Sequence, residues 1–241
     1  MFFDKTVETY IKGDHFSNGL KVKIKSNDED KKAQNRLNYL DEITKNKTVI
    51  HVGCVDHLPL IEEKRTKNIW LHERLDKSSS KCLGIDINEE GISYLQNKLG
   101  YTDVLQMDIL TDEIPSEIQK QNWDYMIMGE ILEHVDNPVL FLSELRKKFS
   151  SSVNCLILTV PNAFRYTNFV YGLKNIEFIN SDHRFWFTPY TLAKVCSMAG
   201  FSVESYYLCQ GFQLPRRKFL TKLLLQKFPL LNDTIILNAR F

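Results

Sequence analysis

Two short apolar runs that end in chemically useful residues carry the clearest functional signal in this sequence. Residues 48–54 end in Gly53 and Cys54, and residues 82–86 end in Asp86. A glycine at the end of a strand lets the backbone approach a ligand closely, and a carboxylate at the end of the next strand can bind the two hydroxyls of a ribose. The pair therefore predicts a nucleoside pocket at the carboxyl edge of a doubly wound α/β sheet.

The rest of the chain alternates strand and helix patterns in the way that such a sheet requires. Strands are predicted at 49–53, 81–86, 103–107, 123–129, 153–160, 201–208 and 233–240, and helices at 33–45, 88–99, 112–121, 137–149 and 189–199. Repeated strand–helix units predict a mostly parallel, seven-stranded Rossmann-like sheet with helices on both faces and an antiparallel last strand. Residues 1–47 are predicted to form an extension that ends in a helix, and residues 48–241 a single domain.

Composition narrows the class of protein. The chain has 241 residues, of which 43% are hydrophobic, and its formal net charge is +1. This balance argues against a dedicated nucleic-acid binder, which normally carries a basic excess. The five cysteines include no C-x-x-C pair and are interpreted as small buried thiols. No apolar core of a signal peptide follows the first methionine, and no run approaches the roughly 18 apolar residues of a membrane span, so a cytoplasmic location is expected.

Six motifs follow one another along this frame, and their order resembles that of a known family. They are the glycine loop at 51–56, the acid at 84–86, the Met-Asp pair at 107–108, the long run at 123–138, the strand end at 158–162 and the segment 182–189, which precedes a helix that ends at 198–201. This order resembles the class I S-adenosylmethionine-dependent methyltransferases. The Glu-x-x-Glu-His and His-x-x-x-Phe-Thr-Pro pieces resemble the subgroup that methylates small metabolites, quinone precursors and sugars.

The resemblance implies S-adenosyl-L-methionine as cofactor and S-adenosyl-L-homocysteine as product. Asp86 would hold the ribose, Asp108 would lie near the adenine amino group, and Gly129 with Glu130 would lie beside the sulfonium. The full predicted cofactor set is Gly53, Cys54, Asp86, Ile87, Met107, Asp108, Ile109, Gly129 and Glu130. The chain departs from the family's usual loop of two or three glycines, because only Gly53 is present, and its first crossover is longer than usual.

Two histidines are the candidates for acid–base chemistry. If the methyl acceptor is a hydroxyl, its proton must leave as the oxygen attacks, and an imidazole with an unperturbed pKa of about 6.5 suits that role. His183 and His134 are therefore the predicted catalytic residues. The alternative is that each histidine only braces a loop, which is the favoured interpretation for His134 and stays open for His183. Glu133 is expected to support the loop, and no metal is expected.

Two segments are predicted to act as lids over the acceptor, at 162–187 and 211–231. The candidate substrate-binding residues are His57, Arg165, Tyr166, Tyr171 and Arg184. The segment 214–231 is basic and leucine-rich. It could contact a membrane surface or a partner subunit, but packing against its own domain is favoured. A homodimer is left open.

The function predicted from these observations is O-methylation of a small polar acceptor, such as a nucleotide-linked sugar in surface-polysaccharide (capsule) biosynthesis. Two alternatives stay open. One is a quinone or lipid-precursor methyltransferase that acts at the membrane surface. The other is a catalytically silent binding subunit, which the glycine-poor loop keeps in consideration.

Overall fold

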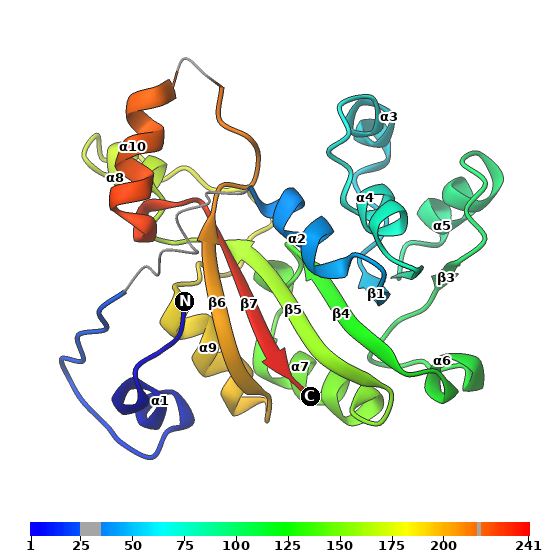
Figure 1. The fold of residues 1–241 in the computed structure, drawn as a ribbon, viewed down its shortest axis with the longest axis horizontal. Helices are drawn as coiled ribbons and strands as arrows, with labels where there is room; N and C mark the ends of the chain where they lie inside the picture. The colour runs from blue at the N-terminus through cyan, green and yellow to red at the C-terminus, as the bar shows by residue number, and fades with distance from the viewer. Residues whose placement is uncertain (25–34, 216–217) are drawn as a thin grey trace. The chain divides into compact units, whose positions relative to one another are not determined.

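The computed structural model describes residues 1–24, 35–215 and 218–241, and its strands form one seven-stranded sheet (Figure 1). The strand order is β3-β2-β1-β4-β5-β7-β6. The strands are β1 (Thr48–Val52), β2 (Lys81–Asp86), β3 (Val104–Gln106), β4 (Trp123–Gly129), β5 (Val153–Pro161), β6 (Ser202–Cys209) and β7 (Thr234–Arg240). Strands β1, β2, β3 and β4 pair in parallel, whereas β6 and β7 pair antiparallel. The predicted fold class is confirmed.

The chain separates into two compact units, which are described one at a time below. Unit 1 comprises residues 1–36, 130–142 and 158–240, and unit 2 comprises residues 37–129, 143–157 and 241. The long helix α7 (Pro138–Phe149) and strand β5 each contribute residues to both units.

Unit 2 holds the first four strands and the helices between them. These helices are α2 (Arg36–Thr44), α3 (Leu58–Thr66), α4 (Leu71–Ser78), α5 (Glu89–Asn97) and α6 (Ser116–Lys120). The enlarged first crossover contains two helices, α3 and α4, where one would suffice to join two parallel strands. As the sequence predicts, Asn88 caps α5 by accepting a hydrogen bond from the backbone N–H of Gly91 at 2.9 Å.

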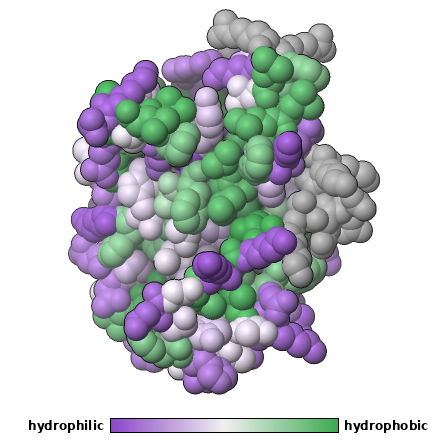
Figure 2. Space-filling view, turned by 90° about the vertical axis from the view of Figure 1, so that its left-hand side faces the viewer, coloured by the Kyte–Doolittle hydropathy of each residue, from purple (hydrophilic) through white to green (hydrophobic). Residues whose placement is uncertain are grey.

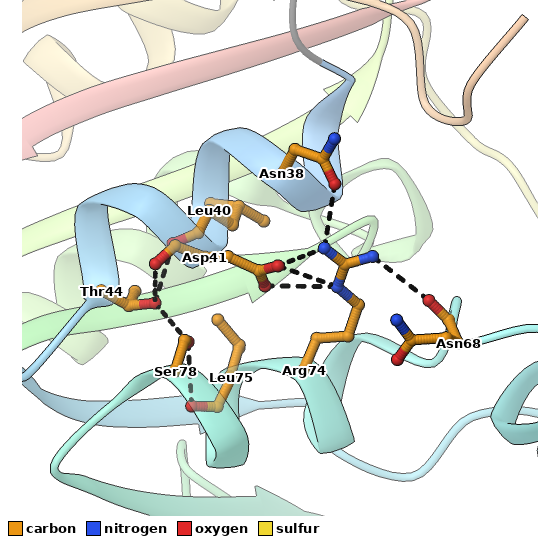
Figure 3. A network of polar contacts seen from close by, with 8 residues as sticks. All are labelled: Asn38, Leu40, Asp41, Thr44, Asn68, Arg74, Leu75 and Ser78. Carbon is orange, nitrogen blue, oxygen red and sulfur yellow. Dashed lines mark hydrogen bonds and ion pairs between the residues drawn. The ribbon is translucent and has the colours of Figure 1, made fainter.

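Helices α2 and α4 of unit 2 are joined by a polar network (Figure 3). The guanidinium of Arg74 donates to the Asp41 carboxylate, to the Asn38 side-chain oxygen at 2.9 Å and to the Asn68 carbonyl at 3.2 Å. At the other end, the hydroxyls of Thr44 and Ser78 lie 2.8 Å apart. The predicted helix at 33–45 is therefore present as α2, with its buried leucines Leu37 and Leu40 inward; residues 33 and 34 lie outside the described residues.

Unit 2 contains a buried pair of histidines, one in strand β1 and one in helix α4. The Nδ1 atoms of His51 and His72 are 3.2 Å apart, and burial lowers the pKa of His72 to about 4. Gly84 of β2 leaves the room for this pair, since a Cβ there would lie 2.8 Å from both His72 Cε1 and Cys54 Sγ. His51 is a core residue, as the sequence predicts, whereas its neighbour His72 was not predicted to have a role.

Unit 1 is built on the antiparallel pair of β6 and β7. Helix α9 (Pro189–Met198) packs on both strands and on α1 (Lys5–Lys12). The remaining helical segments are η2 (Leu132–His134), α8 (Tyr166–Gly172), α10 (Phe219–Lys227) and η4 (Pro229–Leu231). Thr188 begins α9 with a capping box that it forms with Thr191, and this fixes the end of the preceding loop.

The structure corrects three sequence predictions. The extension at 1–47 contains a helix besides the predicted one, because Asp4 caps α1, Gly13 ends it at φ +89°, and Val7 and Ile11 are buried. The helix expected at 112–121 is the shorter α6, which Pro115 precedes. Cys155 is partly exposed, whereas the other four cysteines are buried. Within the described ranges, no helix is long and apolar enough to cross a membrane.

Candidate functional site

The carboxyl ends of β1 and β2 are tied together in unit 2, and this brings the two predicted cofactor residues side by side. Gly53 adopts the left-handed φ of +75°, and its N–H donates to the Ile85 carbonyl at 2.8 Å. Two residues later, the N–H of Val55 donates to Asp86 Oδ2 at 2.8 Å. The loop after β1 thus turns at the glycine and closes on the acid.

The Asp86 carboxylate is oriented by backbone donors on both oxygens. Oδ2 accepts from Val55 and Oδ1 accepts from the N–H of Asn88 at 3.0 Å. Burial raises the pKa of Asp86, against the opposing effect of these backbone hydrogen bonds. Since a carboxylate oxygen can accept more than one hydrogen bond, both oxygens keep capacity for the hydroxyls of a ribose.

The glycine-poor loop has a packing counterpart in α5. A Cβ on Gly91 would lie 2.2 Å from Val55 Cγ1, so the side chain at position 55 occupies the space that a glycine in α5 leaves open. The side chain that this loop carries in place of a glycine is thus the half-buried Val55, and it lies against α5. This arrangement explains how a loop with one glycine is accommodated beside Asp86.

The other predicted cofactor residues of unit 2 occupy the same strand ends with different exposure. Ile87 follows Asp86 directly and is 65% exposed, an unusual position for a large apolar side chain. Met107 and Ile109, beyond β3, are buried, and Asp108 between them accepts from the N–H of Leu110 at 2.9 Å. Gly129 ends β4. Cys54 is buried, which raises the pKa of its thiol.

These features fit an adenosine-containing cofactor. The left-handed glycine, the carboxylate held at the end of β2 and the exposed apolar Ile87 after it offer a close backbone approach, a diol acceptor and an apolar surface for a base. The assignment of individual cofactor contacts to these residues stays a prediction.

In unit 1, three side chains that the sequence brings into question lie together. Glu133 is fully buried, and its Oε1 atom lies 3.9 Å from Nε2 of His183. The rings of His134 and His183 meet edge to face, with centroids 4.7 Å apart. Among the residues that the structure describes, neither oxygen of Glu133 nor Nδ1 of His183 has a hydrogen-bond partner.

The electrostatics of this histidine–glutamate cluster, defined as Glu133, His134 and His183, are unusual. Burial raises the pKa of Glu133 to about 8. Burial, with the neighbouring His134, lowers the pKa of His183 below its ordinary value. At neutral pH, Glu133 is therefore protonated and His183 is neutral, so the imidazole of His183 is able to accept a proton.

The same cluster could hold a divalent cation. One ligand atom from each of the three residues lies within 4.8 Å of the others. Histidine nitrogens with a carboxylate oxygen are a common ligand set for transition metals. The expectation of a reaction without metal stays a prediction, and this cluster is where it can be tested.

Backbone and arginine contacts hold the cluster in place. The N–H of Arg184 donates to the Glu133 carbonyl at 2.8 Å, its guanidinium donates to the His134 carbonyl, and its Nε pairs with Asp136 at 2.8 Å. Arg184 therefore braces the turn that carries Glu133 and His134. Its predicted contact with substrate stays a prediction.

Two of the remaining candidate substrate residues, Arg165 and Tyr171, both contact Phe178 in unit 1. Arg165 donates from Nη2 to the Phe178 carbonyl at 3.0 Å and lies over the Trp186 ring at 4.7 Å. Tyr171 stacks on Phe178 with ring centroids 5.2 Å apart. Tyr166 is exposed at the start of α8, and His57 is exposed at the start of α3 in unit 2.

Glu130 is engaged by a residue that the sequence did not single out. It has a positive φ of +58° and forms an ion pair with Arg36 at 2.9 Å. Arg36 is nearly buried and also donates to Thr159 Oγ1 at 3.3 Å. The strained backbone of Glu130 is held by this pair, a role that its position after β4 does not reveal.

Comparison with known proteins agrees with this fold. A family model described as "Methyltransferase domain" matches residues 25–206. No curated protein gives a significant match. Among solved structures, a putative methyltransferase from Bacillus halodurans is 14% identical, with a TM-score of 0.51 over 85% of this chain and 98% of that one.

Two further proteins of known structure are methyltransferases named for different substrates. Magnesium protoporphyrin IX methyltransferase from Synechocystis, solved with bound S-adenosylhomocysteine, is 14% identical, with a TM-score of 0.51 over 98% of this chain and 93% of that one. The small RNA methyltransferase HEN1 is 19% identical, with a TM-score of 0.53 over 85% of this chain. The present chain spans 25% of the length of HEN1.

A mostly parallel sheet in this order, with a glycine turn after β1 and a held acid after β2, is typical of α/β folds that bind a nucleoside-containing cofactor. The chain belongs to the methyltransferase domain family. It is a class I methyltransferase that depends on S-adenosylmethionine.

Proposed function

We propose that this enzyme transfers a methyl group to a hydroxyl oxygen of a small polar acceptor, with a nucleotide-linked sugar of surface-polysaccharide biosynthesis as the first acceptor class. The observation that carries the proposal is the histidine–glutamate cluster of unit 1, in which His183 is mostly buried and lacks a hydrogen-bond partner on Nδ1 among the described residues. An attacking hydroxyl needs such a proton acceptor, whereas an amine or thiolate acceptor needs it less.

Unit 2 would hold the cofactor, with Asp86 at the ribose, the Gly53 turn against the amino-acid end and Ile87 against the adenine. When bound, S-adenosylmethionine supplies a methyl group that is already activated on a sulfonium. The contribution of these residues is to bind and orient, since an aligned approach of about 3–3.5 Å removes much of the entropic barrier.

His183 would accept the proton of the acceptor hydroxyl as the carbon–oxygen bond forms. The proton moves to an imidazole nitrogen, the methyl group moves to oxygen, and the products are the methyl ether and S-adenosylhomocysteine. The lowered pKa of His183 keeps the ring neutral, and able to accept a proton, at pH 7.

Glu133 would stabilise the imidazolium that this step creates. Its Oε1 lies 3.9 Å from His183 Nε2 and has no competing hydrogen bond among the described residues. Burial raises the pKa of Glu133 to about 8, so its carboxyl is neutral at pH 7 and would face the imidazolium as a dipole. We therefore assign Glu133 a positioning role rather than direct contact with the acceptor.

A second acceptor class is favoured by one cavity of unit 1. A cavity of about 490 Å³ is lined mainly by apolar side chains, with Lys194 and His15 among the polar ones. The apolar lining includes Phe16, Leu20, Val22, Ile24, Phe164 and Leu230. This environment suits the apolar part of a quinone or lipid precursor better than a sugar. The formal net charge of +1 gives no support to RNA as acceptor.

The test is a transfer assay with cofactor labelled on the methyl group and three acceptor pools: nucleotide-linked sugars, lipid-linked glycan intermediates and quinone-like phenols. The proposal predicts label in a sugar hydroxyl. Label only in the phenols would replace the sugar by the second acceptor class.

A matched pair of variants tests the base. His183→Gln is expected to lower kcat by about 10²–10⁴-fold, as loss of a general base does, without changing the affinity for S-adenosylhomocysteine. Lys120→Gln, at an exposed position of α6 in unit 2, is the control and should keep wild-type kcat. Full activity after EDTA treatment is expected. Activity that EDTA removes and Mg²⁺ or Mn²⁺ restores would show that the cluster binds a metal instead of acting as a base.

A further inference from the structure

Two segments of unit 1 expose large apolar side chains at a density found nowhere else among the described residues. In residues 164–179 and 212–228, the exposed side chains are Phe164, Tyr166, Phe169, Leu173, Ile176, Phe178, Ile179, Phe212, Phe219, Leu220, Leu223 and Phe228. We call this surface the apolar face. Figure 2, which views the side of Figure 1 where α8 and α10 lie, shows hydrophobic side chains gathered over a broad area.

The first segment begins just after Asn162, and the second segment ends just before residues that Asn162 binds. Asn162, which is fully buried at the end of β5, donates from Nδ2 to the Leu230 carbonyl at 2.8 Å and to the Asn232 carbonyl at 2.7 Å. Phe164 and Leu230 line the same cavity. The aromatic segment that starts after Asn162 is therefore joined at its base to the end of the leucine-rich segment.

Helix α10 exposes two of its four leucines. Leu225 is its one residue classed as buried, whereas Leu220 is 80% exposed and Leu223 is 46% exposed. Positions 220 and 223 are three apart and share a helix face. The packing on its own domain that the sequence favours is present at Leu225, whereas the face that carries Leu220 and Leu223 is left exposed.

Helix α8 and the loop after it have the same character. No residue of α8 is buried, and Phe169 and Leu173 are 61% and 72% exposed. Contiguous apolar surface of this kind marks a place where the protein meets something that is itself apolar.

The charged residues of the second segment indicate what kind of surface the apolar face binds. From Gly211 to Asn232 the sequence contains no acidic residue but five basic ones, Arg216, Arg217, Lys218, Lys222 and Lys227, of which the arginines lie outside the described residues. Lysines are depleted in the core of protein–protein interfaces, whereas lysines beside exposed leucines and phenylalanines are typical of segments that lie in the headgroup region of an anionic bilayer. Their aliphatic stems extend along apolar surface while the ammonium groups reach lipid phosphates.

We propose that the apolar face docks this enzyme onto an anionic lipid surface, with α8 and α10 in the headgroup region. The inference does not depend on the acceptor, since a lipid-linked sugar and a lipid precursor would both be met there.

The test is flotation of the full chain with vesicles of phosphatidylcholine alone or with about a third phosphatidylglycerol. Wild-type protein should float with the anionic vesicles at low salt, float at least several-fold less with neutral vesicles, and be released by high salt, as electrostatic attraction requires. The double variant Leu220→Ser with Leu223→Ser should reduce flotation at least tenfold, and Lys222→Gln with Lys227→Gln should reduce it several-fold.

Matched controls come from unit 2. Leu60→Ser with Leu110→Ser removes two exposed leucines elsewhere, and Lys98→Gln with Lys120→Gln removes two exposed lysines. Both should float like wild type, and all variants should keep wild-type affinity for S-adenosylhomocysteine as evidence of folding. The proposal is overturned if wild type stays unbound, if the leucine variant floats equally, or if that variant instead turns a lipid-free dimer into a monomer.

Discussion

The two units of this enzyme use their surfaces and their buried groups in opposite ways. Of the large apolar side chains that are exposed in the described part of the chain, unit 2 carries only Leu60, Ile87 and Leu110, and unit 1 carries all the others. Unit 2 also ties its candidate ribose acceptor, Asp86, to two backbone donors. Unit 1 leaves the carboxylate of Glu133 without any such partner among the described residues.

This contrast fits two different tasks, the binding of the cofactor and the binding of the acceptor. A cofactor that is the same in every reaction can be held by a rigid, fully bonded strand edge, and unit 2 has that character. An acceptor that differs between enzymes is met by loops, short helices and unpartnered groups, and unit 1 supplies those.

The largest effect is expected from Glu133→Gln, which removes the unpartnered carboxyl that distinguishes unit 1 from unit 2. The pKa of Glu133 is about 8 in the fold against 4.5 for the free side chain, so the folded state holds a proton that the unfolded chain has released between those pH values. Stability should therefore fall as pH rises from about 4.5 to 8. Glu133→Gln removes this loss and is expected to raise the free energy of unfolding at pH 8, on the order of 4 kcal/mol relative to its effect at pH 4.

Urea unfolding at pH 4, 6 and 8 measures this effect. Glu144→Gln, on the exposed side of α7 in unit 2, is the control and should change stability equally at each pH. An equal effect of Glu133→Gln at the three pH values would show that the carboxyl is not held protonated.

The tight packing of unit 2 can be broken at Gly91. Because an added Cβ would lie 2.2 Å from Val55 Cγ1, Gly91→Ala is expected to cost about 1–3 kcal/mol by overpacking and to weaken cofactor binding through the displaced loop. Val55→Ala in the same chain should recover most of both losses, since the two changes act on one contact.

Thermal unfolding and calorimetry of the two single variants and the double variant check this coupling. Gly100→Ala is not a suitable control because of its φ of +78°, but Gly19→Ala meets no atom within 4 Å and should be neutral. Additive effects of the two changes would remove the packing account of the glycine-poor loop.

A smaller effect is expected at the start of unit 1. Asp4 accepts the N–H of Thr6 at 3.0 Å and caps α1, which packs on α9. Asp4→Ala should lower the free energy of unfolding by about 1 kcal/mol, as loss of a helix N-cap does, and Asp4→Asn should largely restore it. Hydrogen exchange of the α1 amides should report the change, and unchanged protection in Asp4→Ala would contradict the role of the cap.

The sequence was sufficient to predict what depends on local pattern. Strands β2 and β4 have the predicted bounds, Asn88 caps α5, and the glycine and acid lie together because parallel strands end at one edge. Helix α1 was missed although Asp4 and Gly13 are ordinary start and stop signals, because the short helix has only two buried residues.

The site in unit 1 could be predicted only in part. The two histidines stand in a motif that the sequence shows, but the burial of Glu133 beside His183 depends on residues fifty positions apart in the chain. The ion pair of Arg36 with Glu130 and the outward leucines of α10 are likewise decided by tertiary contacts, on which periodicity carries no information.

The central claim, that unit 2 holds the nucleoside of the cofactor through Asp86, is tested most directly by calorimetry with S-adenosylhomocysteine. Wild-type protein should bind, and Asp86→Asn should bind at least about tenfold more weakly, equivalent to about 1.4 kcal/mol, because one charged acceptor is lost. Equal affinity of the two proteins, or no heat from the wild type at high micromolar ligand, would contradict the account.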